Sequence, residues 1–174
     1  MKLFWTLICG AVFVFVAIFG INMFYSRHFP IKYQNEVALA SETFGVEQAM
    51  IFSIINTESH FKANAISNKG AVGLMQILPS TADDVAKKLG IKEFELKNPK
   101  DNIFLGTAYL SFLMEKFKNR TLALCSYNAG PANVNSWLSK YSTDGVNLEK
   151  IPFPETENYI KKFEQNYKFY SKKV

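Results

Sequence analysis

Glu58 occupies a position in the sequence that suggests chemistry. It lies within the segment SIINTESHF, residues 53–61. Ile51, Ile54 and Ile55 recur here at the spacing of one helix face, and the glutamate is the next position on that face. A helix that buries these isoleucines carries the carboxyl group toward the interior, where both burial and the nearby helix C-terminus disfavour the charged form. The pattern predicts a glutamic acid that stays protonated near neutral pH, the state that a general acid requires.

A structural role for Glu58 fits the same spacing. A glutamate at the edge of a core can pair with a lysine or bind the backbone of a loop, because an unpartnered buried carboxylate is costly. The helix pattern alone leaves both roles open. The choice between them depends on the rest of the sequence.

Four short motifs follow one another along the chain. They are Glu58-Ser59, GLMQ at 73–76, SYNAG at 126–130 and PETENY at 154–159. In this order, and with the long stretch NKGAVGLMQILPSTA around the second motif, the set resembles the soluble-type lytic transglycosylases, whose catalytic domain is lysozyme-like. The resemblance covers roughly residues 32–168. Two positions depart from the common pattern: Leu78, where many members have Met, and Ser126, often Ala in the family.

The resemblance implies a predominantly α-helical fold and peptidoglycan as the substrate, cleaved at the β-1,4 bond between N-acetylmuramic acid and N-acetylglucosamine. Glu58 would be the catalytic acid, with Ser59 supporting its surroundings and Tyr159 reaching back toward it. Further residues are implied to line the sugar cleft or bind saccharide: Ser67, Gly73, Leu74, Met75, Gln76, Tyr127, Asn128 and Ala129. Pro154 and Thr156 are expected to shape a turn and cap the last helix.

A second catalytic carboxylate is not evident in the sequence. Ordinary glycosidases need two carboxyl groups that flank the scissile bond. The acids Asp83, Asp84, Glu93 and Glu95 fall in a polar helix and the loop after it, where we expect them to face solvent. One acid suffices if the muramoyl 6-hydroxyl attacks its own C1, because that attack is intramolecular. The resemblance implies this mechanism, with Glu58 acting as acid and then as base to give a 1,6-anhydro product.

Two other functions remain open from the sequence. A lysozyme-type hydrolase would cleave the same bond with water, which the missing second carboxylate disfavours. A non-catalytic module would bind peptidoglycan or serve as a scaffold, which the retention of Glu58 disfavours. The small size of the chain hints at service to a wall-spanning secretion or motility apparatus.

The first residues of the chain are strongly apolar. Residues 3–25 carry no charge, and as a helix they would be about 34 Å long, enough to cross a bilayer core. We therefore expect residues 1–25 to be a single-pass anchor in a bacterial inner membrane, with the catalytic domain in the periplasm. A cleaved signal segment, with secretion to the periplasm, is the alternative.

The rest of the chain is predicted to be almost wholly helical. Residues 26–35 are expected to be a linker and 36–174 the catalytic domain. The expected helices are 36–45, 46–61, 79–90, 98–118, 120–130, a short one from 131 through 138, and 155–172. Residues 62–73 are rich in Asn, Gly and Ser and are predicted to form a loop. No convincing alternating strand pattern is present.

Composition sets limits on partners and cofactors. The chain has 174 residues, with 48% hydrophobic, 20% charged and a net charge of +5, which fits an anionic polymer or a membrane surface nearby and gives no indication of nucleic acid. Cys9 and Cys125 make no disulfide framework, and Cys125 is expected to be a buried apolar side chain. His28 and His60 have no partners at metal-ligand spacing, so we predict neither a metal nor another cofactor.

Overall fold

The computed structural model describes the backbone of residues 2–174. The side chains of residues 2, 3, 5–9, 11, 12 and 22 lie outside this description, Cys9 among them. The chain divides into two compact units, Met1–Ile31 and Lys32–Val174. The second unit carries Glu58 and every other residue implied to contact substrate.

The first unit consists mainly of the helix α1 (Lys2–His28). Part of the predicted membrane span at 3–25 has side chains outside the described residues. Within what the structure does describe, no helix combines the length and the apolar character that crossing a bilayer demands, so the predicted transmembrane anchor is not supported.

The second unit is helical, as the sequence predicts. Its helices are α2 (Gln34–Phe44), α3 (Gln48–Ser59), α4 (Pro79–Leu89), α5 (Pro99–Phe117), α6 (Arg120–Ala129), α7 (Pro131–Tyr141) and α8 (Pro154–Tyr170). Between α3 and α4 the chain forms a loop with two isolated antiparallel bridges, Ile66 to Val72 and Val72 to Ile77. Their pairing is too short to be a sheet, and it folds the loop back on itself beside the end of α3.

Helix boundaries follow local sequence signals. The Asn98 side chain accepts a hydrogen bond of 2.9 Å from the Lys100 amide at the start of α5, which confirms the predicted N-cap. Asn119 caps α6 in the same manner, through the Leu122 amide at 3.1 Å. Gly45 ends α2 with φ of 66°, a left-handed conformation that glycine adopts at little cost.

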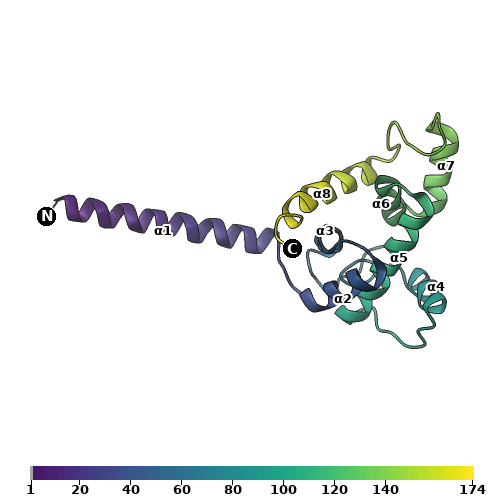
Figure 1. Cartoon of the computed structure of the whole chain (residues 1–174), viewed down its shortest axis with the longest axis horizontal. Helices are drawn as coiled ribbons and strands as arrows, with labels where there is room; N and C mark the ends of the chain where they lie inside the picture. The colour runs from purple at the N-terminus through teal and green to yellow at the C-terminus, as the bar shows by residue number, and fades with distance from the viewer. Residues whose placement is uncertain (1) are drawn as a thin grey trace. The chain divides into compact units, whose positions relative to one another are not determined.

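Helix α3 lies at the centre of the second unit, with α8 packed along it (Figure 1). All of its residues from Ala49 to Asn56 are buried, so the helix is enclosed on every side over two turns. Phe52 stacks on Tyr170 of α8 with ring centroids 5.5 Å apart. The Asn56 amide donates to the Asn166 side chain at 2.9 Å. These contacts hold the C-terminal end of α3, where Glu58 lies, against α8.

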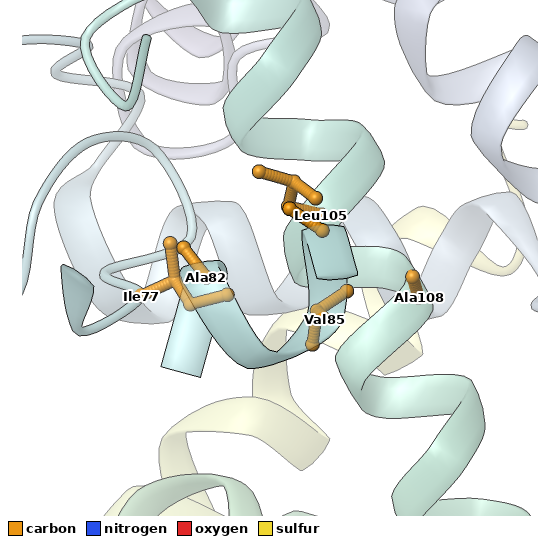
Figure 2. Close-up of a cluster of buried hydrophobic side chains, with 6 residues drawn as sticks. Ile77, Ala82, Val85, Leu105 and Ala108 are labelled. Carbon is orange, nitrogen blue, oxygen red and sulfur yellow. The ribbon is translucent and has the colours of Figure 1, made fainter. Parts of the chain in front are cut away.

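A separate apolar cluster joins α4 to α5 (Figure 2). Leu105 of α5 is only 1% exposed and packs with Ile77, Ala82 and Val85. Ile77 ends the loop that follows α3, so this cluster also fixes one end of that loop. Its packing thereby connects the stability of α5 to the geometry near Glu58.

We expect Leu105→Ala to destabilise the fold by about 2–5 kcal/mol, because it removes buried methyl groups and leaves a cavity. Urea unfolding followed by circular dichroism measures the change. Leu89→Ala is the matched control, since Leu89 ends α4 and is 36% exposed. Equal losses in the two variants would contradict the assignment of Leu105 to the core.

Candidate active site

Glu58 lies in the last turn of α3 and is partly exposed. Burial of its carboxyl group raises the pKa from 4.5 to about 7, and the nearby Tyr159 hydroxyl acts in the opposite direction. Desolvation wins because no cation is among the groups that influence the carboxyl. The protonated form expected from the isoleucine pattern is therefore well populated near neutral pH.

Two tyrosines approach Glu58 from different helices. Tyr127 comes from α6 and Tyr159 from α8, and burial raises the pKa of both phenols well above the ordinary value, with the Glu58 charge adding to the rise. The Tyr127 hydroxyl donates to the Met75 carbonyl at 2.8 Å. The Tyr159 hydroxyl is buried without a hydrogen bond of standard geometry within the described residues, although it is close enough to Glu58 to affect its pKa. It remains available as a donor to a Glu58 carboxylate.

Ser59 connects the end of α3 to the loop after it. Its buried hydroxyl donates to the Leu74 carbonyl at 2.8 Å, with the Ile55 carbonyl as an alternative acceptor at 3.2 Å. The Ser59 hydroxyl therefore connects the end of α3 to the backbone of the loop at Leu74 and is itself shielded from solvent.

The GLMQ loop presents little side-chain surface. Leu74 and Met75 are fully buried, and Gly73 has φ of 82°. Gln76 also has a positive φ, 48°, and its side-chain amide donates to the carbonyls of Gly73 at 2.8 Å and Ala65 at 3.2 Å. These two bonds offset the strain of a left-handed non-glycine residue. Only Gln76 of this motif faces the groove described next.

A groove of about 370 Å³ runs beside Tyr127. It is lined by Lys69, Gln76, Ile77, Leu78, Thr81, Tyr109, Tyr127, Asn128, Ala129, Gly130, Pro131, Asn133, Phe153, Glu155 and Thr156. Four of the predicted substrate-contacting residues thus share one surface: Gln76, Tyr127, Asn128 and Ala129. Ser67 is not among the lining residues; its hydroxyl accepts from the Ala71 amide at 3.0 Å and closes a turn.

Thr156 does not cap the last helix. Phe153 occupies the cap position of α8, without a side-chain hydrogen bond to the helix. The Thr156 hydroxyl donates to the Asn128 side-chain oxygen at 2.9 Å and is almost fully buried. The threonine therefore holds Asn128 at the groove, a role that requires α6 and α8 to meet and has no local sequence signal.

Asn102 and Tyr109 of α5 were missed by the sequence patterns. Tyr109 packs beside Tyr127 with ring centroids 5.5 Å apart and lines the groove. Asn102 is fully buried and binds the GLMQ loop. The sequence does show that Asn102 is a polar residue among apolar positions of α5. This signal does not reveal that its partner is the Met75 amide.

The arrangement suits proton donation by one carboxylic acid. Asp83, Asp84, Glu93 and Glu95 are exposed, and no carboxylate is among the groups that alter the pKa of Glu58. Glu155, the carboxylate that lines the groove, is also exposed and lies 3.7 Å from the Lys69 ammonium. In the part of the chain that the structure describes, no group of three His, Cys, Asp or Glu side chains could hold a metal ion. Cys125 is buried, which raises the pKa of its thiol to about 11 and agrees with the expected apolar role.

Comparison with known proteins identifies relatives of the second unit. The family model "Transglycosylase SLT domain" matches residues 36–148. The soluble lytic murein transglycosylase of Salmonella typhimurium is 36% identical over 143 residues, which cover 78% of this chain and 22% of that protein. The membrane-bound lytic murein transglycosylase C of Yersinia enterocolitica is 35% identical over 130 residues, which cover 67% of this chain and 36% of that protein. The chain thus spans well under half the length of these relatives.

Solved structures give the same result. An inactive variant of the lytic transglycosylase Slt from Pseudomonas aeruginosa superposes with a TM-score of 0.78 and 35% identity, covering 86% of this chain and 25% of that one. The 70 kDa soluble lytic transglycosylase of Escherichia coli superposes with a TM-score of 0.75 and 32% identity, and the match covers 82% of this chain and 24% of that one. The chain therefore belongs to the SLT transglycosylase domain family, and it has that family's all-α, lysozyme-like fold.

Proposed function

We propose that the protein is a peptidoglycan lytic transglycosylase. It cleaves the β-1,4 bond between N-acetylmuramic acid and N-acetylglucosamine and leaves a 1,6-anhydromuramoyl end. The observation that carries this proposal is a single desolvated glutamic acid, Glu58, which acts on the groove-lining Tyr127 and whose own pKa no second carboxylate alters. The carboxylate that lines the groove, Glu155, is exposed and faces the Lys69 ammonium at 3.7 Å. The catalytic unit, which we place at residues 36–174, works on the side of the membrane where peptidoglycan lies.

The reaction needs one proton to leave Glu58 and one to return. Glu58 donates its proton to the glycosidic oxygen as the bond from that oxygen to C1 of the muramoyl residue breaks. The resulting carboxylate then takes the proton of the muramoyl 6-hydroxyl, whose oxygen bonds to C1. A pKa of about 7 suits both steps, because neither form of the group is strongly disfavoured near neutral pH.

Tyr159 has a distinct role in these two proton transfers. Its buried hydroxyl has no other hydrogen-bond partner in the described structure and is able to donate to the Glu58 carboxylate once the first proton has left. That interaction stabilises the charged intermediate state of the enzyme. Tyr127 has its hydroxyl committed to the Met75 carbonyl and offers its ring to the groove.

Substrate contacts divide into two groups. Gln76, Tyr127, Asn128 and Ala129 line the groove and are proposed to touch the glycan directly, through hydrogen bonds and an aromatic face. The buried or turn-forming residues are proposed to act by shaping the loop that carries Gln76; they are Ser59, Ser67, Gly73, Leu74 and Met75.

The names of the related proteins support this proposal. Both the soluble and the membrane-bound proteins are murein transglycosylases, and the Pseudomonas structure is of a variant inactivated by a glutamate-to-glutamine substitution.

Purified peptidoglycan digested by the protein should yield mainly 1,6-anhydromuramoyl ends, identified by mass spectrometry. Glu58→Gln should reduce turnover at least about 1,000-fold, since it removes the proton donor while keeping shape. Circular dichroism and glycan co-sedimentation should match those of the unsubstituted protein.

Each result decides between functions. Products with mainly free reducing ends would show that the protein is a hydrolase and not a lyase. Unchanged turnover in the Glu58→Gln protein would remove Glu58 from the mechanism. Glycan binding with no cleavage by the unsubstituted protein would indicate a binding module.

Activity should fall as pH rises through about 7, because the first step needs protonated Glu58. The rate at saturating glycan, measured from pH 5 to pH 9, reports this descending limb. A rate that stays level to pH 9 would show that the ionisation of Glu58 does not limit the reaction.

Stability should respond to the same ionisation. The folded protein holds Glu58 with a raised pKa, so this group favours folding below pH 4.5, and its contribution is lost as pH rises from 4.5 to about 7. Glu58→Gln should therefore gain stability over the unsubstituted protein across that window, by about 1–3 kcal/mol once partial solvent exposure is allowed for. Urea unfolding at pH 4 and pH 8 measures the difference, and a gain that is equal at both would contradict the raised pKa.

A further inference from the structure

Asn102 lies in the first part of α5, and its side chain is fully buried. Its oxygen accepts a hydrogen bond from the Met75 amide at 2.7 Å. Its nitrogen donates to the carbonyls of Val72 at 2.9 Å and Leu96 at 2.8 Å. Both N–H groups and the oxygen of the amide are thus used, so its orientation is determined.

Gly73 makes room for this side chain. A Cβ atom at Gly73 would lie 2.2 Å from the Asn102 nitrogen and 2.4 Å from the Leu96 carbonyl oxygen. The positive φ of Gly73, 82°, also disfavours other residues. The first residue of the GLMQ motif is therefore matched to an amide on another helix, which brings α5 against the loop.

The loop is held from three helices at two successive residues. Asn102 of α5 binds the Met75 N–H, and Tyr127 of α6 binds the Met75 carbonyl at 2.8 Å. Ser59 of α3 binds the Leu74 carbonyl at 2.8 Å. The Met75 residue thus connects Asn102 to Tyr127 through one N–H and one C=O, with no other side chain between them.

Tyr127 is the member of this chain of contacts that reaches the reacting group. Tyr127 lines the groove, and the charge of the Glu58 carboxylate raises the pKa of its phenol. The titratable group that acts on Glu58 is Tyr159 of α8, while Tyr109 acts on Tyr127 and Cys125 acts on Tyr159. Each of these groups is neutral at pH 7, so solvent access is what sets the ionisation of Glu58.

We propose that Asn102 is a positioning residue for the proposed reaction: by fixing the Met75 backbone it orients Tyr127 beside Glu58 and keeps water from the carboxyl group. This role rests on the proposed function of Glu58. It assigns to this residue of α5 the task of maintaining a dry environment for that acid.

The test compares Asn102→Ala with Asn98→Ala. Both remove an asparagine side chain near the start of α5, but the Asn98 side chain is exposed and caps the helix through the Lys100 amide, whereas Asn102 binds the Met75 amide. Asn102→Ala should lower kcat about 10- to 100-fold, as misplacement of a catalytic constellation by an ångström does, with a smaller change in KM. It should also move the descending limb of the pH–rate profile to lower pH, because water admitted near Glu58 favours the carboxylate. Asn98→Ala should keep the kcat and the limb of the unsubstituted protein.

A double variant tests the route through Met75. Tyr127→Phe removes the hydrogen bond at the other end of the same residue and should also shift the limb. The combined Asn102→Ala/Tyr127→Phe protein should lose less than the product of the two single losses, because residues in one network do not act independently. Fully multiplicative losses would overturn the proposed route.

Other outcomes are equally decisive. A kcat loss in Asn102→Ala that follows only the folded fraction, with an unmoved limb, would leave Asn102 a merely structural residue. If the Asn102→Ala protein does not fold, Asn102→Ser, which retains one hydrogen-bond donor, takes its place in the test. Failure of both variants to fold would likewise overturn the positioning role. If the unsubstituted protein yields anhydro ends while Asn102→Ala matches it in every respect, the positioning role fails and the proposed function stands. If the unsubstituted protein yields no anhydro ends, the proposed function fails.

Discussion

The desolvation of one carboxyl group is the constraint on which the site depends. Glu58 lies at the end of a helix whose preceding two turns are enclosed, so its side chain emerges beside the core with little water around it. Burial raises its pKa to about 7, and no neighbouring cation reverses the effect. A carboxylic acid in this state is held ready to lose a proton, and the fold bears the cost when it ionises.

The rest of the second unit maintains that environment. Helix α8 holds the end of α3 and contributes Tyr159, while α6 contributes Tyr127 and Asn128. The GLMQ loop fills the remaining side with buried Leu74 and Met75, so its motif is largely a packing and backbone motif. Its only groove-lining member, Gln76, has its amide nitrogen bound to backbone carbonyls, which leaves the side-chain oxygen as the atom available to a ligand.

Much of this could be predicted from local sequence signals. Apolar periodicity, proline and glycine placement, and the Asn98 cap located α2 to α8 to within a few residues, because these signals act within a helical turn. The isoleucine face placed Glu58 at the core edge. Burial of Cys125 followed from its apolar neighbours. By contrast, the expectation that Thr156 caps α8 was wrong, because α8 begins at Pro154 and Thr156 lies within its first turn, where its hydroxyl donates to Asn128.

The sequence by itself determined the helices, the acid and the order of the motifs, since each depends on residues close together in the chain. Only the tertiary structure decided which side chains meet: Asn102 binds a loop 27 residues away, and Tyr127 reaches Met75 across 52. Hydrogen bonds of this kind depend on the packing of α3, α5, α6 and α8, and no local pattern encodes their partners. The pKa of Glu58 belongs to the same class, because desolvation is a property of everything packed around a group.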